Sequence, residues 1–223
     1  MGAETPKQFL ELDGMPLILF TLRRLAASAA ITEFFISTRA EDIVSLQDTV
    51  AKAGLGRPAR VVHGGDTRQQ SVANALAQVD PTTEIVLVHD AVRPFVTVEQ
   101  LDRVIAETRK RGAAILGIPA IDTVKEVKRA TLPEDMALIT TTIPRERIVL
   151  AQTPQAFSYA LLRDAFRMAQ TDGVLASDES ALVERFGHEV FVVLGSERNF
   201  KITRPADMDL ARFYLEQERK APR

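Results

Sequence analysis

Residues 84–94 read Glu84-Ile85-Val86-Leu87-Val88-His89-Asp90-Ala91-Val92-Arg93-Pro94, an apolar run that ends abruptly in charged residues. The first part, 84–88, is mostly β-branched and predicts a central parallel strand buried on both faces, which Pro94 stops from continuing. Asp90 then lies at the carboxyl end of this strand, where open α/β sheets bind their ligands. With Arg93 close behind, Asp90 can hold a metal ion beside an anion. The alternative is an ordinary strand-ending aspartate paired with Arg93.

Composition narrows the class of protein. The chain has 223 residues, 46% of them hydrophobic and 26% charged, and no linker-like stretch, so we predict one soluble domain. The apolar runs are shorter than the roughly 18 residues of a membrane helix, and the first residues lack a basic region followed by an apolar one, which predicts a cytoplasmic protein.

Cysteine is absent and the three histidines are scattered, so disulfides, thiol nucleophiles and thiolate zinc sites are excluded and any metal should be bound by oxygen. The net charge of -2 gives no general attraction to nucleic acid or anionic lipid.

Helical and strand patterns alternate along the chain, which predicts parallel β-α-β units. Apolar spacing and capping signals predict helices over 16–29, 41–53, 67–79, 98–111 and 161–169, another opening near 177–180, and a last one from 205. Apolar runs predict strands over 34–36, 59–62, 84–88, 113–118 and 190–194. Ser177 fits the N-cap of its helix, with Ser180 at the third helical position.

A glycine pair, Gly64 and Gly65, follows the strand predicted over 59–62. Thr67 and Gln70 then form a capping-box pattern that opens a helix. The free amide groups of that helix and the Arg68 side chain favour negative charge, which predicts a nucleotide-contacting turn. The alternative is a tight β-α connection with an ordinary cap.

Residues 122–128 and 138–142 alternate in polarity on either side of a polar break at 129–135, which predicts a β-hairpin. Its loop is longer than a tight turn and its faces are polar. We therefore expect it to project from the sheet and to need a partner for burial. Alternatively it lies flat on its own domain.

Six short motifs occur in the order in which one known family carries them. They are Pro6-Lys7-Gln8, Gly64-Gly65-Asp66-Thr67-Arg68 with Ser71, His89-Asp90-Ala91-Val92-Arg93-Pro94, Thr153-Pro154-Gln155, Asp178-Glu179 and Lys201-Ile202-Thr203-Arg204-Pro205. Together they resemble the 2-C-methyl-D-erythritol 4-phosphate cytidylyltransferases and span nearly the whole chain. The resemblance implies a Rossmann-like, mostly parallel α/β sheet with flanking helices, in a single nucleotidyltransferase domain over 1–223 with a projecting β-hairpin arm at about 120–145.

The resemblance also implies a reaction and its partners. A member of this family transfers CMP from CTP to 2-C-methyl-D-erythritol 4-phosphate in the non-mevalonate isoprenoid pathway, giving the cytidine diphosphate product and pyrophosphate. The implied cofactor is Mg²⁺. The implied assembly is a homodimer clasped by the hairpin arm.

Residue roles follow from the same resemblance. The implied nucleotide-binding residues are Lys7, Gly64, Gly65, Asp66, Ser71, Asp90 and Ala91. The implied substrate-binding residues are Asp90, Arg93, Thr123, Arg145, Thr153, Ser177 and Lys201. Asp90 is the implied metal ligand, and the implied catalytic residues are Lys7, Arg145 and Lys201.

In this scheme Lys7 stabilises the charge that develops around the α-phosphate, and Arg145 and Lys201 orient the attacking substrate. Ser177 stands where the family often has Thr, and either hydroxyl can donate a hydrogen bond. If Thr123 and Arg145 lie on the arm, each active site can take them from its own chain or from the other subunit.

The chain departs from the family pattern at its start. Family members begin with a strand and a glycine-rich turn whose Arg contacts the CTP phosphates, about twenty residues before the Pro-Lys-Gln motif, and Met1-Gly2 resembles the end of that turn. The absent strand would be central and its two neighbours would lack ladder partners. We therefore expect Met1 to be internal to a longer protein, with the missing segment encoded upstream.

Two other functions remain open at this stage. A related enzyme acting on another alditol phosphate, such as ribitol 5-phosphate, would show the same nucleotide-side motifs. An inactive nucleotide-binding or dimerising protein would also be consistent with the absence of the glycine-rich turn.

Overall fold

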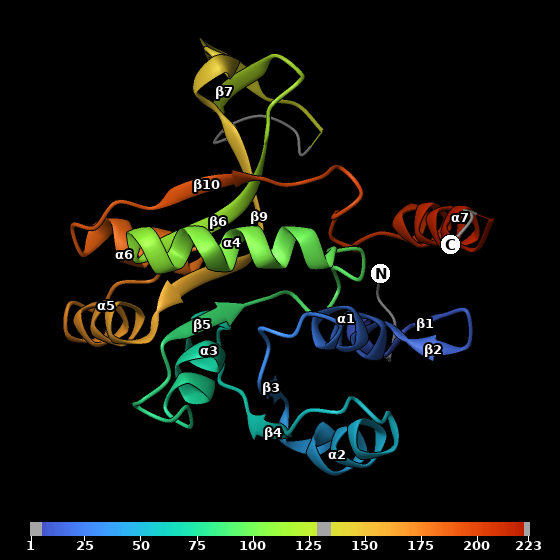
Figure 1. Cartoon of the computed structure of the whole chain (residues 1–223). Coiled ribbons are helices and arrows are strands. Elements are labelled where there is room, and N and C mark those ends of the chain that lie inside the picture. The colour runs from blue at the N-terminus through green and yellow to red at the C-terminus, as the bar shows by residue number, and fades with distance from the viewer. Residues whose placement is uncertain (1–5, 129–134, 221–223) are drawn as a thin grey trace.

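A computed structural model of the chain describes residues 6–128 and 135–220. Figure 1 shows helices packed around short sheets, with β7 standing apart from the body. The strands are β1 (Glu11–Leu12), β2 (Met15–Pro16), β3 (Phe34–Thr38), β4 (Ala59–His63), β5 (Ile85–Val88), β6 (Ala113–Pro119), β7 (Val124–Lys128), β8 (Leu138–Ile143), β9 (Val149–Ser158) and β10 (Phe191–Leu194). The helices are α1 (Leu17–Ala26), α2 (Ile43–Lys52), α3 (Arg68–Leu76), α4 (Val98–Arg111), α5 (Tyr159–Thr171), α6 (Glu179–Arg185) and α7 (Pro205–Lys220), with 3-10 turns η1 (Lys7–Phe9), η2 (Ala40–Asp42) and η3 (Arg145–Arg147). No helix in the described ranges is long and apolar enough to cross a membrane.

The α/β class with flanking helices and a hairpin arm is confirmed, and its main sheet is mixed. Four strands pair in the order β10-β6-β9-β5, and β3 pairs with β4 in a separate ladder. The pairs β10–β6 and β3–β4 are parallel, whereas β9 runs antiparallel to both β5 and β6.

The prediction that 84–88 forms a central parallel strand is wrong. β5 is the edge of its four-stranded sheet and its partner β9 is antiparallel. The reason is tertiary, because β9 returns from the arm and inserts between β5 and β6. The end of β5 still places Asp90 at the carboxyl edge, as predicted.

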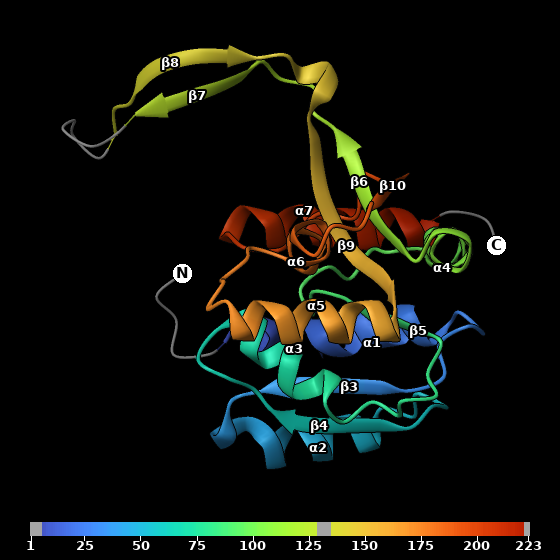
Figure 2. The same cartoon turned by 90° about the vertical axis from the view of Figure 1, so that its left-hand side faces the viewer.

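The projecting hairpin is confirmed. Figure 2 shows β7 and β8 extending from the body, to which β6 and β9 connect them. The two strands pair with each other, and their residues are almost all exposed. Most of the polar break predicted at 129–135 lies outside the described residues, as do Met1 and Gly2.

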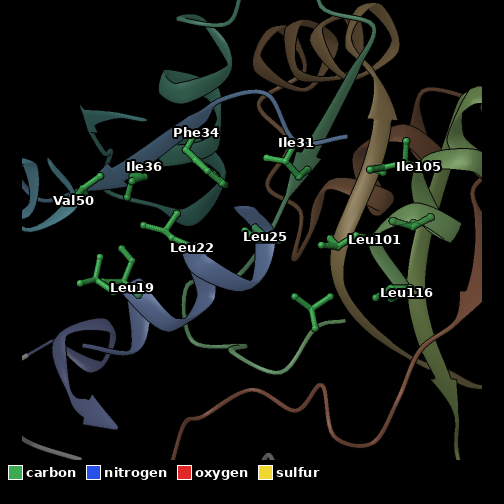
Figure 3. Packing of buried hydrophobic residues seen from close by; sticks show 14 of the residues in the cluster. Leu19, Leu22, Leu25, Ile31, Phe34, Ile36, Val50, Leu101, Ile105 and Leu116 are labelled. Atoms are coloured by element: carbon green, nitrogen blue, oxygen red, sulfur yellow. The ribbon is translucent and has the colours of Figure 1, made fainter. Parts of the chain in front are cut away.

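The core forms where helices cover the strands. In Figure 3, Leu22 of α1 lies toward Phe34 and Ile36 of β3, and Leu101 of α4 lies toward Leu116 of β6. Each of these side chains is buried, and each contributes roughly 1.5–3 kcal/mol by leaving water. The apolar spacing of α1 and α4 thereby fixes both helices on their strands.

A cavity of about 490 Å³ separates β3 from β5. In the described structure β3 is paired only with β4 and β5 only with β9, so the other edge of each strand carries no ladder. Apolar residues of α1, β3 and β5 line most of the cavity, and Asp90, Arg68 and Lys201 line it as well. Residues at the carboxyl ends of both strands, Thr38 of β3 and Val88 of β5, line this cavity.

Four local predictions need correction. Helix α1 ends at Ala26 rather than 29, and α3 ends at Leu76 rather than 79. The N-cap of α6 is Asp178, which accepts a hydrogen bond from the Ala181 amide, and not Ser177. Thr67 caps α3 as predicted, but Gln70 accepts from the Asp66 amide instead of closing a reciprocal box.

Candidate active site

Asp90 lies at the centre of a cationic cluster beyond the end of β5. Its Oδ2 atom is 3.2 Å from Lys201 Nζ and 3.3 Å from Arg93 Nε, and its Oδ1 atom is 3.6 Å from Arg68 Nε. Arg93 also donates from Nη1 to the Asn199 carbonyl at 2.8 Å, which holds its side chain in place. Arg68 is also paired with Glu179, so Lys201 and Arg93 are the cations whose charge suits a phosphate here.

These cations also set the charge state of Asp90. Burial alone would raise the pKa of its carboxyl group, but the charges of Lys201, Arg68 and Arg93 outweigh burial and lower the pKa below its ordinary value. Asp90 is therefore an ionised oxygen donor at neutral pH.

Arg68 connects this cluster to α6. Its Nη1 and Nη2 atoms donate to the two carboxylate oxygens of Glu179, at 2.7 and 3.0 Å. The Glu179 side chain is only 1% exposed, and burial raises the pKa of its carboxyl group despite the opposing charge of Arg68. The pair joins the first residue of α3 to the first residue of α6.

A second hollow, of about 370 Å³, adjoins the cavity beside Asp90. The glycine turn that was predicted to contact the nucleotide lines this hollow, through Gly64, Gly65, Asp66 and Ser71. Ser71 Oγ accepts from the Gly65 amide at 3.0 Å and donates to the Thr67 carbonyl at 2.9 Å, so the turn is held against α3.

The Pro-Lys-Gln motif lies at the junction of the two hollows. Gln8 lines both of them. Its neighbour Lys7 begins η1 and is exposed, so the ammonium group is accessible to a ligand.

Hydrogen bonds tie the loop that carries Asp90 to β9 and to α1. The Asp90 amide donates to Thr153 Oγ1 at 3.0 Å, and the Ala91 carbonyl accepts from Thr21 Oγ1 at 2.8 Å. The site therefore draws on η1, the turn before α3, the end of β5, β9 and the segment before α7.

Six of the predicted site residues line neither hollow, namely Lys7, Arg93, Thr123, Arg145, Thr153 and Ser177. Of these, Thr123, Arg145 and Ser177 also make no hydrogen bond or ion pair with Asp90 in the described residues. Thr123 and Arg145 lie at the base of the arm and are exposed, and Arg145 Nη1 donates to the Ile121 carbonyl at 2.6 Å. Ser177 is exposed just before the cap of α6.

Sequence reasoning overlooked several polar groups that build the site. His89, Gln155 and Asn199 were given no role, yet each bonds to a residue of the quoted motifs. Gln155 Nε2 donates to Asp178 Oδ2 at 2.7 Å, and Asn199 Nδ2 donates to the Thr153 carbonyl at 2.9 Å. The available signal was their position inside or beside the motifs.

The donor set can be tested against a metal ion. No cluster of three or more His, Cys, Asp or Glu side chains occurs within residues 6–128 and 135–220. Mg²⁺ commonly uses one or two carboxylates and takes its other ligands from substrate phosphates and water. A site in which Asp90 is the one protein ligand fits this pattern. The described residues do not provide a metal site made wholly of protein ligands.

Comparison with known proteins gives a consistent family. Residues 1–217 match the family model described as "IspD: 2-C-methyl-D-erythritol 4-phosphate cytidylyltransferase". Proteins of that name from Acidobacterium capsulatum and Solibacter usitatus are 51% and 47% identical to the chain. Each match covers 95% of this chain, and the two matches cover 88% and 86% of the respective relatives.

Solved structures agree in fold. The enzyme of the same name from Thermus thermophilus is 36% identical and superposes with a TM-score of 0.78, over 95% of this chain and 94% of that one. The 4-diphosphocytidyl-2C-methyl-D-erythritol synthase of Anaerococcus prevotii is 31% identical, with a TM-score of 0.83 over 94% and 93%.

Proposed function

Because the chain belongs to the 2-C-methyl-D-erythritol 4-phosphate cytidylyltransferase family, we propose that the two hollows beside Asp90 are where CTP and the sugar-alcohol phosphate meet. The enzyme transfers CMP from CTP to 2-C-methyl-D-erythritol 4-phosphate and releases pyrophosphate. The observation that carries the location of the site is the Asp90 carboxylate, which is paired with Arg93 and Lys201 and faces Arg68, the residue that follows the glycine turn and Thr67.

Cytidylyl transfer requires positioning and charge neutralisation more than proton transfer. An oxygen of the substrate phosphate attacks the α-phosphorus of CTP in line, and the bond to the bridging oxygen of pyrophosphate breaks. We assign Lys7 to the charge that develops on the α-phosphate, and Lys201 and Arg93 to the substrate phosphate. The exposure of Lys7 and the cluster around Asp90 support these assignments.

The nucleotide side is assigned to the glycine turn. Gly64, Gly65, Asp66 and Ser71 would bound the cytidine, with backbone groups reading the base edge. Support comes from the hollow that these residues line beside Gln8. Ala91 would contact the nucleotide from the neighbouring loop.

Asp90 is the residue that we assign to Mg²⁺. When bound, Mg²⁺ would neutralise phosphate oxygens and orient the triphosphate. The lowered pKa of the Asp90 carboxyl group supports this role, because an ionised oxygen is what a hard cation requires.

A homodimer through the arm is part of the proposal. Several large apolar side chains of the arm and its base are exposed, namely Val127, Met136, Leu138, Ile139, Val149 and Leu150. A two-stranded hairpin is only marginally stable alone in water, so a second copy that covers these residues would stabilise it. The same contact would carry Thr123 and Arg145 toward the site of the partner, and a cytoplasmic location stays a prediction.

Purified protein assayed with CTP, Mg²⁺ and each alditol phosphate tests this function. We expect pyrophosphate release with 2-C-methyl-D-erythritol 4-phosphate and little with ribitol 5-phosphate. A preference for ribitol 5-phosphate would overturn the substrate assignment.

The variant Asp90→Asn tests the site. It should lower turnover and raise the Mg²⁺ concentration required for half-maximal rate, while Asp209→Asn, an exposed carboxylate on α7, should behave as wild type. Identical Mg²⁺ titrations for Asp90→Asn and wild type would show that Asp90 does not bind the metal.

A further inference from the structure

Glu179 is a buried carboxylate to which the reaction described above gives no role. It is 1% exposed, and both of its oxygens accept hydrogen bonds from Arg68, which is 111 positions away in the chain. A buried charge is retained when it is paired, but the pair itself is weak evidence for a gain in stability. The position of Arg68 beside Asp90 suggests a different purpose for the pair.

The two oxygens of Asp90 are not equivalent. Oδ2 lies within 3.3 Å of both Arg93 Nε and Lys201 Nζ, so cations already occupy it. Among the described residues no hydrogen bond to Oδ1 is formed, and Arg68 Nε lies 3.6 Å from it, too far for a hydrogen bond. Oδ1 is therefore the oxygen that remains open to another cation.

Arg68 is close enough to close this opening. A hydrogen bond between Nε and Oδ1 has a typical length of about 2.9 Å, so the guanidinium would have to move by less than about 1 Å. Freed from Glu179, it could turn two parallel N–H groups toward the Asp90 carboxylate, the geometry that Arg prefers with such partners. Glu179 opposes this movement because it holds both Nη atoms on the side of α6.

We propose that Glu179 is a positioning residue that keeps Arg68 off Asp90 Oδ1 and so leaves this oxygen available to the metal ion that accompanies CTP. The inference rests on the proposed function, in which Asp90 binds that metal. It predicts competition, since Arg68 and the metal seek the same oxygen once Glu179 is neutralised. Replacing a residue that acts through a metal ligand in this way commonly changes metal affinity by about 10–100-fold.

The test measures Mn²⁺ binding by electron paramagnetic resonance in the presence of CTP and without the second substrate, so that no turnover is needed. Glu179→Gln should weaken Mn²⁺ binding by about tenfold, and it should raise the Mg²⁺ requirement of the reaction in parallel. At CTP concentrations that saturate each protein, so that loss of the Arg68 charge near the nucleotide does not enter, the double variant Arg68→Gln/Glu179→Gln should return Mn²⁺ affinity to within about twofold of wild type, because the competing cation is gone. Glu184→Gln, an exposed carboxylate on the same helix, is the matched control.

Each result bears on the inference. Unchanged Mn²⁺ affinity in Glu179→Gln, or a double variant as weak as the single one, would show that Glu179 is only structural. Asp90→Asn is measured alongside, and if it binds Mn²⁺ as wild type does, the metal role of Asp90 fails and the inference fails with it. If Asp90→Asn weakens binding and Glu179→Gln does not, the proposed function stands and this inference alone is overturned.

Folding of the single variant is checked by thermal unfolding. If Glu179→Gln does not fold, Arg68→Met/Glu179→Met carries the test, because it leaves no buried charge. The inference predicts wild-type or tighter Mn²⁺ binding for this variant, and weaker binding would overturn it.

Discussion

Thr153 Oγ1 lies 3.1 Å from His89 Nδ1, and this contact ties β9 to the loop that carries Asp90. The same hydroxyl accepts from the Asp90 amide at 3.0 Å. His89 Nε2 lies 3.1 Å from the Arg93 carbonyl, which can only accept, so Nε2 carries the proton and Nδ1 accepts from Thr153. The Thr153 hydroxyl therefore donates its one hydrogen to His89 in this structure, and we predict that it positions the loop.

Replacing Thr153 tests this connection. Thr153→Val should lower the free energy of unfolding by about 1–3 kcal/mol, because the Asp90 amide loses its acceptor and His89 loses its donor. Thr153→Ser retains the hydroxyl and should recover most of this loss. Urea unfolding of the three proteins measures it. A Val variant of unchanged stability but raised KM for the alditol phosphate would instead mean that the hydroxyl contacts the substrate.

The pH dependence of the free energy of unfolding should reflect the lowered pKa of His89. Burial, which outweighs the hydrogen bond to the Arg93 carbonyl and the charge of Asp90, lowers the pKa of His89 from 6.5 to about 4. Between these values the unfolded chain binds more protons than the folded one, so this contribution is complete above pH 6.5 and is lost as the pH falls toward 4. A pKa shift of this size corresponds to at most about 3 kcal/mol of stability. The His89 side chain is only partly buried, so screening by solvent makes the actual contribution smaller.

Other groups titrate nearby, so the measurement is a difference. The raised pKa of Glu179 contributes with the opposite sign, since its stabilising protonated form is lost as the pH rises. Urea unfolding of wild type and His89→Gln at several values between pH 4.5 and about 7.5 isolates the histidine. The stability of wild type should rise more steeply with pH than that of His89→Gln, and parallel curves would refute the assignment.

The glycine turn should tolerate no side chain at Gly65. A Cβ atom there would lie 2.6 Å from Gln70 Cβ, so Gln70 would have to move. It would then lose the 3.0 Å hydrogen bond that its side chain accepts from the Asp66 amide. Gly65→Ala should raise KM for CTP roughly tenfold, equivalent to about 1.4 kcal/mol. KM for the alditol phosphate serves as the internal control, and equal changes in both constants would argue against a nucleotide-side role.

Subunit mixing should show whether the arm acts in trans. Lys7→Ala and Arg145→Ala should each abolish most turnover, because one removes a cation of the core and the other a cation of the arm. If each site takes Arg145 from its partner, co-refolded mixtures contain heterodimers with one intact site and should regain about a quarter of wild-type activity. Mixtures that remain as inactive as the two parents would indicate that each arm serves its own chain.

Local patterns determined much of the secondary structure. The helix predicted over 98–111 coincides with α4, because its apolar spacing, its N-cap Thr97 and Gly112 at its end all agree. The strands at 59–62 and 113–118 and the hairpin arm were also predictable, since their apolar runs or alternation arise within a few residues of one another. The motifs likewise marked Asp90, Arg93 and Lys201 as site residues, and the structure brings these three together.

The partners of each element depended on distant parts of the chain. Val149–Ser158 contains Gln152, Pro154 and Gln155 and lacks a simple strand pattern, yet it is the strand that pairs with both β5 and β6 and makes the sheet mixed. The Gln152 and Gln155 side chains can be buried because they form hydrogen bonds with Ser196, Asn199 and Asp178. These partners are distant in the chain, so no local rule predicts them.

The same distinction holds at the site. Sequence supplied the carboxylate of Asp90 and the cations near it, because the strand ending at Val88 sets where they emerge. Only the tertiary structure decided that Glu179 forms an ion pair with Arg68 and that Thr153 forms a hydrogen bond with His89. Hydrogen bonds and ion pairs act over about 3 Å, so their partners are chosen by the packing of helices and strands and not by separation along the chain.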